Sequence, residues 1–204
     1  MPDPCLYTGY QRDSGRPPRD VYDGPGNSVA VTGTANGDSC LQKLPALFPK
    51  EKSCPISGPH SFKCIHQPDF VVNSPNFLVF ENFYYVSTAV EVKGESASPD
   101  NKVTYPLITT PKEFKNAATR VCTLSWADVQ GKGPMDSQSK DNDLKWCFSS
   151  SYAYSFLVNG LGLPEDKRIT TQKFVEDSEI EWALGAALKE ASEFLKRSHL
   201  RQQS

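Results

Sequence analysis

The chain has 204 residues, of which 38% are hydrophobic and 23% are charged, and its formal net charge is -2. These values are typical of a folded chain with one large domain or two small ones. The balanced charge argues against a basic surface for nucleic acid or anionic membranes, so we expect no nucleic-acid partner. No stretch approaches the roughly 18 consecutive apolar residues of a membrane-spanning helix.

Six cysteines form an even set without any C-x-x-C spacing, which favours three disulfides and an extracytoplasmic compartment over metal binding or redox chemistry. The start, MPDPCLYTGYQ, has no basic segment followed by an apolar one, so it predicts no signal peptide. We reconcile the two observations by interpreting the chain as the C-terminal piece of a longer protein that is secreted, extracellular or in the lumen of the secretory pathway. The signal or membrane anchor would then lie upstream.

Residues 3–75 are rich in Gly, Pro, Ser and Asn, which predicts loops and short strands rather than helices. Four possible zinc ligands fall within this part, but their spacing, C-x5-H-x3-C-x-H, matches no standard zinc finger. A short-loop disulfide between two of them is therefore favoured over a metal site. The four residues are Cys54, His60, Cys64 and His66.

The stretch 76–92, NFLVFENFYYVSTAVEV, is too densely apolar for clean alternation and fits a helical stripe only in part. The pattern is therefore compatible with either a strand or a buried helix. Its centre, FENFYYV (80–86), carries four aromatic residues, which can fill a core or hold a flat ligand. We expect Phe80 and Phe83 to lie in the core.

Residues 109–130 predict a helix with Thr110 as its cap and Pro111 in its first turn. Residues 131–143 form a polar linker, and residues 146–164 predict a second helix that ends at Gly160. The serines of CFSSSYAYS indicate a helix face of small residues, and residues 168–175 form a plausible strand. The apolar positions of the first of these helices are Phe114, Ala117, Ala118 and Val121.

Residues 177–197 predict the strongest helix, capped by Asp177 or Ser178 and with one apolar face. A glycine inside a helix costs about 1 kcal/mol relative to alanine. Gly185 in this helix therefore indicates the close approach of another element or, together with Trp182, a helix beside a ligand cleft. The apolar face consists of Ile180, Leu184, Ala187, Leu188, Ala191 and Leu195.

The sequence contains no G-x-S-x-G nucleophile turn and no Gly-rich phosphate-binding loop of either common type. Adjacent carboxylates such as Glu165 and Asp166 are more simply solvated charges than an acid/base pair. We therefore assign no catalytic residue and no metal ligand within this chain.

Four stretches of the sequence form a specific pattern through their order and the placement of their cysteines. They are DPCLYTGY (3–10), SCPISGPHSFKC (53–64) leading into NFLVFENFYYV (76–86), VCTLSWADVQ (121–130) followed by KWCF (145–148), and SYAYSFLVNGLGLPEDKRITTQKFVEDSEIEWALGAAL (151–188). Together they resemble the apyrase family, the ectonucleoside triphosphate diphosphohydrolases.

The resemblance implies an α/β fold with ribonuclease-H-like lobes, as in actin and Hsp70-type ATPases. Residues 1–174 would form part of the second, nucleobase-binding lobe, and residues 175–204 a helix that packs on the first lobe. The phosphate-binding loops and the catalytic glutamate of the family belong upstream and have no match here. We therefore expect the chain alone to be inactive.

The resemblance also implies three disulfides and a set of substrate-binding residues. The nucleobase would lie between the rings of Tyr85 and Trp146, Asn82 would contact its edge, and Trp182 and Gly185 would shape the cleft between the lobes. The implied disulfides are Cys5–Cys40, Cys54–Cys64 and Cys122–Cys147.

By this likeness the complete protein hydrolyses nucleoside tri- or diphosphates of the ATP and ADP class. A divalent cation, Ca²⁺ or Mg²⁺, would be bound mainly by the upstream part. Two alternatives stay open, namely a non-catalytic nucleotide- or partner-binding lobe and a Golgi nucleoside diphosphatase.

Overall fold

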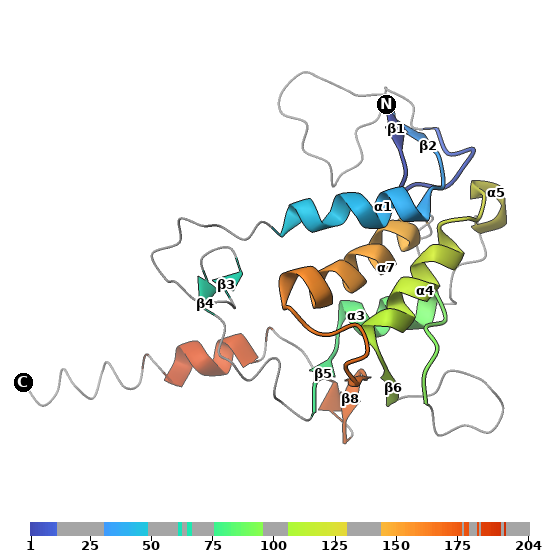
Figure 1. Ribbon diagram of the computed structural model, residues 1–204. Helices are drawn as coiled ribbons and strands as arrows, with labels where there is room; N and C mark the ends of the chain where they lie inside the picture. Colours follow the sequence, from blue (N-terminus) through green and yellow to red (C-terminus); the bar gives the residue numbers. More distant parts are fainter. Residues whose placement is uncertain are drawn as a thin grey trace, which may run out of the picture.

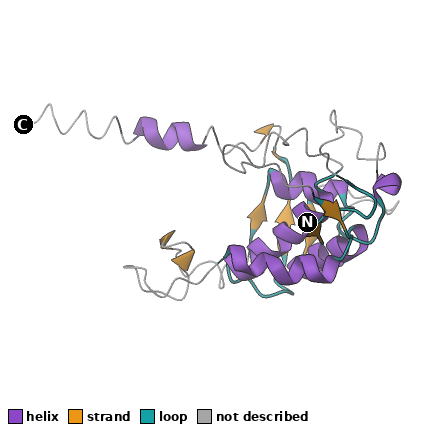
Figure 2. Ribbon diagram, turned by 90° about the horizontal axis from the view of Figure 1, so that it is seen from above, coloured by secondary structure: helices purple, strands orange, loops and turns teal. Residues whose placement is uncertain are grey.

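The computed structural model describes residues 1–11, 31–48, 61–62, 65–66, 76–95, 106–129, 144–176, 178–179, 183, 185–192 and 194. Within this part, helices pack around a small mixed sheet (Figures 1 and 2), in agreement with the expected α/β class. None of the helices in the described part is both long enough and apolar enough to cross a membrane.

The central sheet has three short strands, β5 (Leu78–Val79), β6 (Leu107–Thr109) and β7 (Ile169–Thr171), in the order β5-β7-β6. β5 runs parallel to β7, whereas β6 runs antiparallel to it. β7 therefore lies in the middle of the sheet, and its Ile169 and Thr171 are buried. This order joins segments that are far apart in the sequence.

The largest helices are α3 (Asn82–Ala89), α4 (Pro111–Val121) and α7 (Trp146–Ser155), which continues as the π-helical turn η2 (Phe156–Gly160). α7 is central because α4, α3 and α1 (Gly37–Lys43) all pack against it. Figure 1 shows α7 between α1 and α4. Smaller elements are η1 (Leu44–Leu47), α5 (Trp126–Val129), and the paired strands β1 (Pro2–Asp3) with β2 (Thr32–Gly33), β3 (Ser61–Phe62) with β4 (Ile65–His66), and β8 (Phe174–Val175) with β9 (Ser178–Glu179).

α4 begins as its sequence predicts but ends earlier. The Thr110 hydroxyl accepts a hydrogen bond from the backbone N–H of Glu113 at 3.4 Å, and Pro111 is the first helical residue. The apolar positions predicted for this helix are all buried. The expected continuation to residue 130 is wrong, because α4 ends at Val121 and a second helix, α5, starts at Trp126. The Asp128 carboxylate caps α5 by accepting a hydrogen bond from the backbone N–H of Ser125 at 3.1 Å.

The serine-rich helix α7 is confirmed, including its end at Gly160. Ser150, Ser151 and Ser155 are fully buried, which agrees with the predicted face of small residues, and the Ser151 Oγ atom lies 3.7 Å from the Sγ atom of Cys122 at the end of α4. The Ser150 hydroxyl donates to the carbonyl of Trp146 at 2.6 Å, which satisfies its polar atom within the helix. The chain turns away after η2 at Gly162, whose φ of 76° suits glycine.

The N-terminal prediction of loops and strands is wrong for residues 37–43, which form α1. The Asn36 side chain caps this helix by accepting from the Ser39 backbone N–H at 2.9 Å. The ambiguous stretch 76–92 is resolved as a strand followed by a helix, β5 and α3. The predicted strand over 168–175 is divided into β7 and β8.

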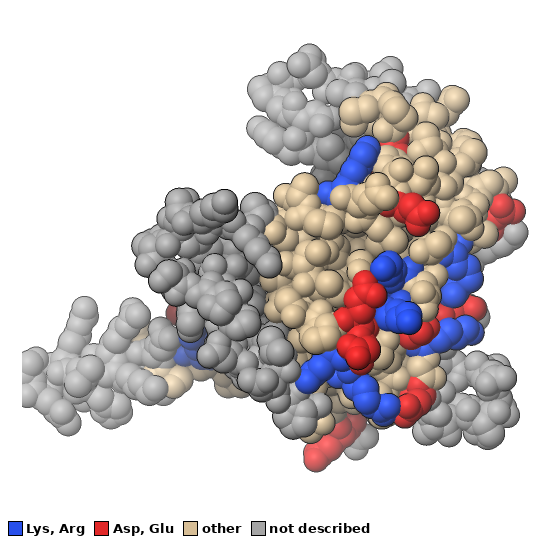
Figure 3. All heavy atoms as spheres, viewed as in Figure 1, with Lys and Arg blue, Asp and Glu red and all other residues tan. Residues whose placement is uncertain are grey.

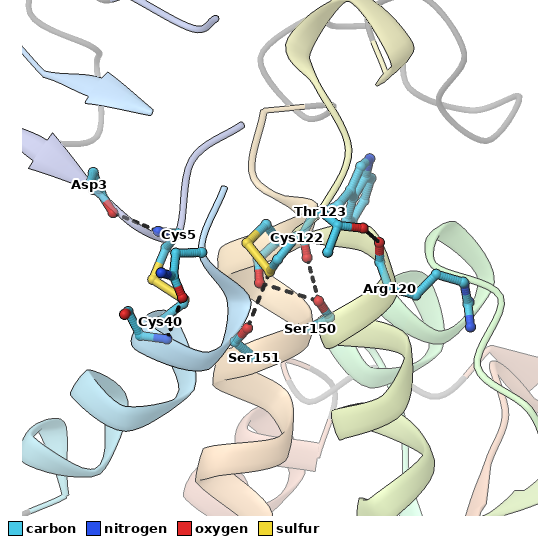
Figure 4. Close-up of a disulfide and its surroundings, with 12 residues drawn as sticks. Asp3, Cys5, Cys40, Arg120, Cys122, Thr123, Ser150 and Ser151 are labelled. Carbon is cyan, nitrogen blue, oxygen red and sulfur yellow. Dashed lines mark hydrogen bonds between the residues drawn. A yellow bond between two sulfur atoms is a disulfide. The ribbon is translucent and has the colours of Figure 1, made fainter. Parts of the chain in front are cut away.

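Two of the predicted disulfides are confirmed (Figure 4). Cys5 is bonded to Cys40 of α1, and Cys122 at the end of α4 is bonded to Cys147 of α7. The side chains of Cys54, His60, Cys64 and His66 lie outside the described residues, so both the third disulfide and the zinc alternative stay untested.

The predicted last helix begins later than expected. Ser178 does not cap it, because Ser178 pairs with Val175 in the β8–β9 hairpin. The described residues from Ala183 to Phe194 are helical and exposed. Among them, Leu188 is 64% exposed and Phe194 is 72% exposed. They lie apart from the body of the molecule in both ribbon views. The described residues of the predicted apolar face, Ala187, Leu188 and Ala191, are therefore not packed against the described part of this chain.

Basic and acidic side chains are interspersed on the face of the molecule in Figure 3. Two of the ion pairs join Lys115 to Glu165 at 3.0 Å and Arg168 to Glu95 at 2.7 Å. This mixed distribution agrees with the balanced charge of the sequence and shows no broad basic patch on the described part of that face.

Candidate functional site

The candidate site lies where the parallel strands β5 and β7 end. Parallel strands have their carboxyl ends at the same edge of a sheet, and ligands of open α/β sheets bind outside these ends. α3 follows β5 after Phe80 and Glu81, and Lys173 follows β7 after Gln172. The two segments meet, because the Lys173 Nζ atom lies 5.6 Å from the centroid of the Tyr85 ring.

The turn between β5 and α3 decides which aromatic rings face the solvent. Glu81 precedes the helix with φ 54° and ψ -119°, and its carbonyl accepts from the Tyr85 N–H at 3.1 Å. Phe83 is partly buried and packs edge-on against the buried Phe114 with ring centroids 6.1 Å apart, so it lies against the core, close to its predicted place. Tyr85, two residues later, is 40% exposed. Phe80 is partly buried.

The far end of α3 is held by Arg120 of α4. One guanidinium nitrogen of Arg120 donates to the carbonyls of Val90 and Glu91, the latter at 3.1 Å. These carbonyls lie at the helix C-terminus, where a cation is favourable because the last peptide dipoles have no helical partner. The C-terminal end of α3, the helix that carries the exposed ring of Tyr85, is thus tied to α4.

Trp146, the proposed partner of Tyr85, is the first residue of α7. It is partly buried against the core, and its Nε1 atom is buried without a hydrogen-bond partner in the described part of the chain. α3 and α7 pack together, but no direct ring contact joins Tyr85 to Trp146 among the described residues. The sandwich of a base between these rings therefore stays a prediction.

The other predicted contact residues are distributed over two places. Asn82 is the exposed first residue of α3, one turn before Tyr85. Gly185 lies in the C-terminal helix, where an added Cβ atom would meet nothing within 4 Å. Trp182 lies outside the described residues. The structure thus joins Asn82 and Tyr85 on one helix, while the roles of Trp182 and Gly185 stay predictions.

Sequence reasoning missed Lys173. Its ammonium pairs with Glu179 Oε1 at 3.1 Å and lies 5.3 Å from the centroid of the Phe174 ring as well as near Tyr85. The ion pair with Glu179, followed by the polar contact with Tyr85, raises the pKa of Lys173. No local signal in RITTQKFV points to Tyr85, because the contact depends on the pairing of β5 with β7.

A metal centre is not formed by the described residues, which contain no group of three or more His, Cys, Asp or Glu side chains placed to hold an ion. The site at the sheet edge has instead an exposed aromatic ring, an amide side chain and an ammonium group. Such a set can stack against a flat ring and donate hydrogen bonds to its edge.

The described residues form a mixed α/β fold with a candidate site for a flat ligand at the carboxyl ends of the parallel strands β5 and β7. Comparison with known proteins identifies its family. The model of the GDA1/CD39 (nucleoside phosphatase) family matches residues 1–203, so the chain belongs to this family. The resemblance found in the sequence is thereby confirmed.

Among curated proteins, the chain is similar to ectonucleoside triphosphate diphosphohydrolase 7 of Xenopus tropicalis, at 28% identity over 100% of this chain and 30% of the relative. It is 27% identical to ectonucleoside triphosphate diphosphohydrolase 2 of Gallus gallus over 91% of this chain and 36% of the relative. It is also 28% identical to a guanosine-diphosphatase of Schizosaccharomyces pombe over 72% of this chain and 24% of the relative. The chain therefore spans between 24% and 36% of the length of these relatives.

Proposed function

We propose that this chain supplies the nucleobase-binding lobe of an enzyme that hydrolyses nucleoside tri- and diphosphates to the monophosphate and phosphate. The observation that carries the proposal is the family match over residues 1–203. The exposed ring of Tyr85 at the carboxyl ends of β5 and β7 supports it, because this is the edge where α/β sheets bind ligands.

In this proposal the base lies between Tyr85 and Trp146, and Asn82 contacts its edge. Stacking on an aromatic side chain contributes roughly 1–3 kcal/mol per base and discriminates little between bases. Residues 1–174 form this lobe, and residues 175–204 pack on the other lobe with Trp182 and Gly185 near the cleft. The exposure of Leu188 supports a packing partner outside the described residues.

The hydrolytic step itself belongs to the upstream part of the complete protein. The family likeness implies a divalent cation, Ca²⁺ or Mg²⁺, and a glutamate that activates water. The described residues hold no group that fits such an ion. We therefore derive no catalytic step from this chain, whose role is to bind and orient the nucleotide.

A location in the secretory pathway or outside the cell is part of the proposal, supported by the disulfides Cys5–Cys40 and Cys122–Cys147. A diphosphatase of the Golgi lumen is a second candidate, favoured by the similarity to a protein named guanosine-diphosphatase. A non-catalytic nucleotide-binding lobe would share the same site and differ in the upstream part.

The test is the binding of ADP to this chain by calorimetry. Tyr85→Ala should weaken binding roughly 5- to 100-fold, as expected when one stacking partner is lost. Tyr152→Ala is the matched control, because Tyr152 is 37% exposed on α7 and Tyr85 is 40% exposed on α3. The control should bind ADP as the unchanged chain does.

Two results would contradict the proposal. One is an unchanged chain that binds no ADP at millimolar concentration. The other is a Tyr85→Ala variant that melts at a lower temperature but retains its affinity, since Tyr85 would then be a packing residue.

A further inference from the structure

The ammonium group of Lys173 covers one face of the Tyr85 ring. Its Nζ atom lies over this ring, 5.6 Å from the ring centroid, and it is also 5.3 Å from the centroid of Phe174. Glu179 of β9 holds the ammonium by an ion pair at 3.1 Å. The side chain of Lys173 is only 27% exposed, so these partners restrict its position.

A base that stacks on this face of Tyr85 needs the space that the ammonium occupies. Stacked aromatic rings have their centroids about 4.5–7 Å apart, and the 5.6 Å between Nζ and the Tyr85 centroid lies within this range. The ammonium is itself attracted to the ring, because the face of an aromatic ring is electrically negative. A flat ligand and Lys173 therefore compete for the same face of Tyr85.

The contacts that hold the ammonium in place are individually weak. Lysine carries its charge on a flexible four-carbon stem, so the ammonium can move away without a change in the backbone. Glu179 is exposed, and solvent weakens its ion pair with Lys173. The hairpin presents Phe174 and Val175 to solvent, so little apolar packing opposes its movement. A ligand can therefore displace Lys173 at a small cost.

We propose that Lys173 makes an autoinhibitory contact: in the free chain its ammonium, held by Glu179, occupies the face of Tyr85 on which a base stacks, and a nucleotide binds only after displacing it. The proposal rests on the proposed function, because that function stacks the base on Tyr85. The free site is closed by this contact, so the affinity for a nucleotide is reduced by the fraction of the chain in which the face is covered. The reduction acts on stacking and is therefore the same for every base.

The test compares the binding of ADP and of adenosine to the unchanged chain and to Lys173→Ala by calorimetry. Loss of the contact between a cation and an exposed ring should increase both affinities roughly 2- to 5-fold. Adenosine has no phosphate, so its affinity does not depend on attraction between Lys173 and an anion. Lys173→Arg retains a cation that stacks on aromatic faces, and it should bind both ligands as the unchanged chain does.

The matched control is Lys93→Ala, which removes the same charge from an exposed lysine elsewhere on the molecule and should leave both affinities unchanged. Nuclear magnetic resonance gives a readout that does not depend on affinity. The nuclear Overhauser effect between the Lys173 side chain and the Tyr85 ring should be present in the free chain and disappear in saturating adenosine.

Two results would overturn the autoinhibitory role and leave the proposed function intact. One is an affinity for adenosine that does not rise in Lys173→Ala, while Tyr85→Ala still weakens binding. The other is an Overhauser effect that persists when the chain is saturated with adenosine. If neither the unchanged chain nor Lys173→Ala binds either ligand, the proposed function and this inference are both wrong.

Discussion

Glu165 joins two helices through a single carboxylate oxygen. Its Oε1 accepts from the Tyr154 hydroxyl of α7 and from the Lys115 ammonium of α4, the latter at 3.0 Å. The hydrogen bond from Tyr154 and then that from Lys115 lower the pKa of Glu165. Folding therefore favours the ionised carboxylate. The stabilisation is present above the unfolded-state pKa of about 4.3 and is lost as the pH falls through the folded-state value.

Glu165→Gln should accordingly lower the melting temperature at pH 7, and its deficit should shrink at pH 3. The Lys115–Glu165 pair is 41% exposed on both sides, so solvent limits its contribution to about 1 kcal/mol. The measurement is thermal unfolding followed by circular dichroism at both pH values. Asp166→Asn, at the exposed neighbouring position, is the control and should change little. A deficit of equal size at both pH values would show that the carboxylate charge is not involved.

Residue-scale features of the candidate site were predictable where a local pattern determines them. The aromatic run placed Phe83 in the core, because a buried helix face needs large apolar side chains. Tyr85 is exposed, but its assignment by resemblance stays a prediction, and composition alone could not separate it from Phe83. Lys173 could not be found in this way, because its contact with Tyr85 depends on which strands pair.

At the scale of elements, the two described disulfides should contribute unequally to the free energy of unfolding. Cys122 and Cys147 are completely buried where α4 meets α7, and Cys5 is 8% exposed beside α1. Loop entropy alone would make Cys5–Cys40 slightly more stabilising, because its sequence separation is 35 residues and that of Cys122–Cys147 is 25. The difference between loops of these lengths is only about 0.3 kcal/mol. Burial where two helices cross should therefore decide which disulfide contributes more to the free energy of unfolding.

We expect Cys122→Ala with Cys147→Ala to cost roughly 2–4 kcal/mol in the free energy of unfolding, and more than the paired replacement of Cys5 and Cys40. Urea unfolding under non-reducing conditions measures both variants against the unchanged chain. The Cys5–Cys40 variant serves as the control for a generic loss of chain cross-linking. A larger loss from this control variant would mean that loop entropy outweighs the packing of α4 on α7.

The starts of helices were better predicted than their ends. Thr110 and Pro111 mark the start of α4 through backbone chemistry that is local in sequence. The end of α4 depends on a competing cap at Ser125 and Asp128, which the periodic apolar pattern conceals. α1 was missed because a short helix within a Gly- and Pro-rich stretch depends on the Asn36 cap and its disulfide to Cys5.

At the scale of the whole molecule, the position of the candidate site follows from the order β5-β7-β6. This order places β7 between two strands that precede it in sequence, so residues near 80 and near 173 share one sheet edge. Local propensity carries no information on such a pairing, since each strand has only two or three residues. The family resemblance supplied the fold class, whereas the contact between Tyr85 and Lys173 had to come from the structure.

The C-terminal helix gives the final prediction at this scale. Burial of a large apolar side chain contributes roughly 1.5–3 kcal/mol, but Leu188 and Phe194 are 64% and 72% exposed and cannot contribute this to the body of the molecule. Removal of residues 182–204, which retains the β8–β9 hairpin, should therefore change the free energy of unfolding by less than about 0.5 kcal/mol. Because exposed apolar side chains promote association, the truncated chain should also show weaker light scattering at high concentration than the unchanged chain.

The control for the scattering measurement is the double substitution Leu188→Asp with Phe194→Asp, which retains the length of the chain and removes the two exposed apolar side chains. It should scatter as weakly as the truncated chain, and urea unfolding should give it the same midpoint as the unchanged chain. A loss of several kcal/mol on truncation would show that the helix packs on residues 1–174. The proposal that its apolar face is reserved for the other lobe of the complete protein would then be wrong.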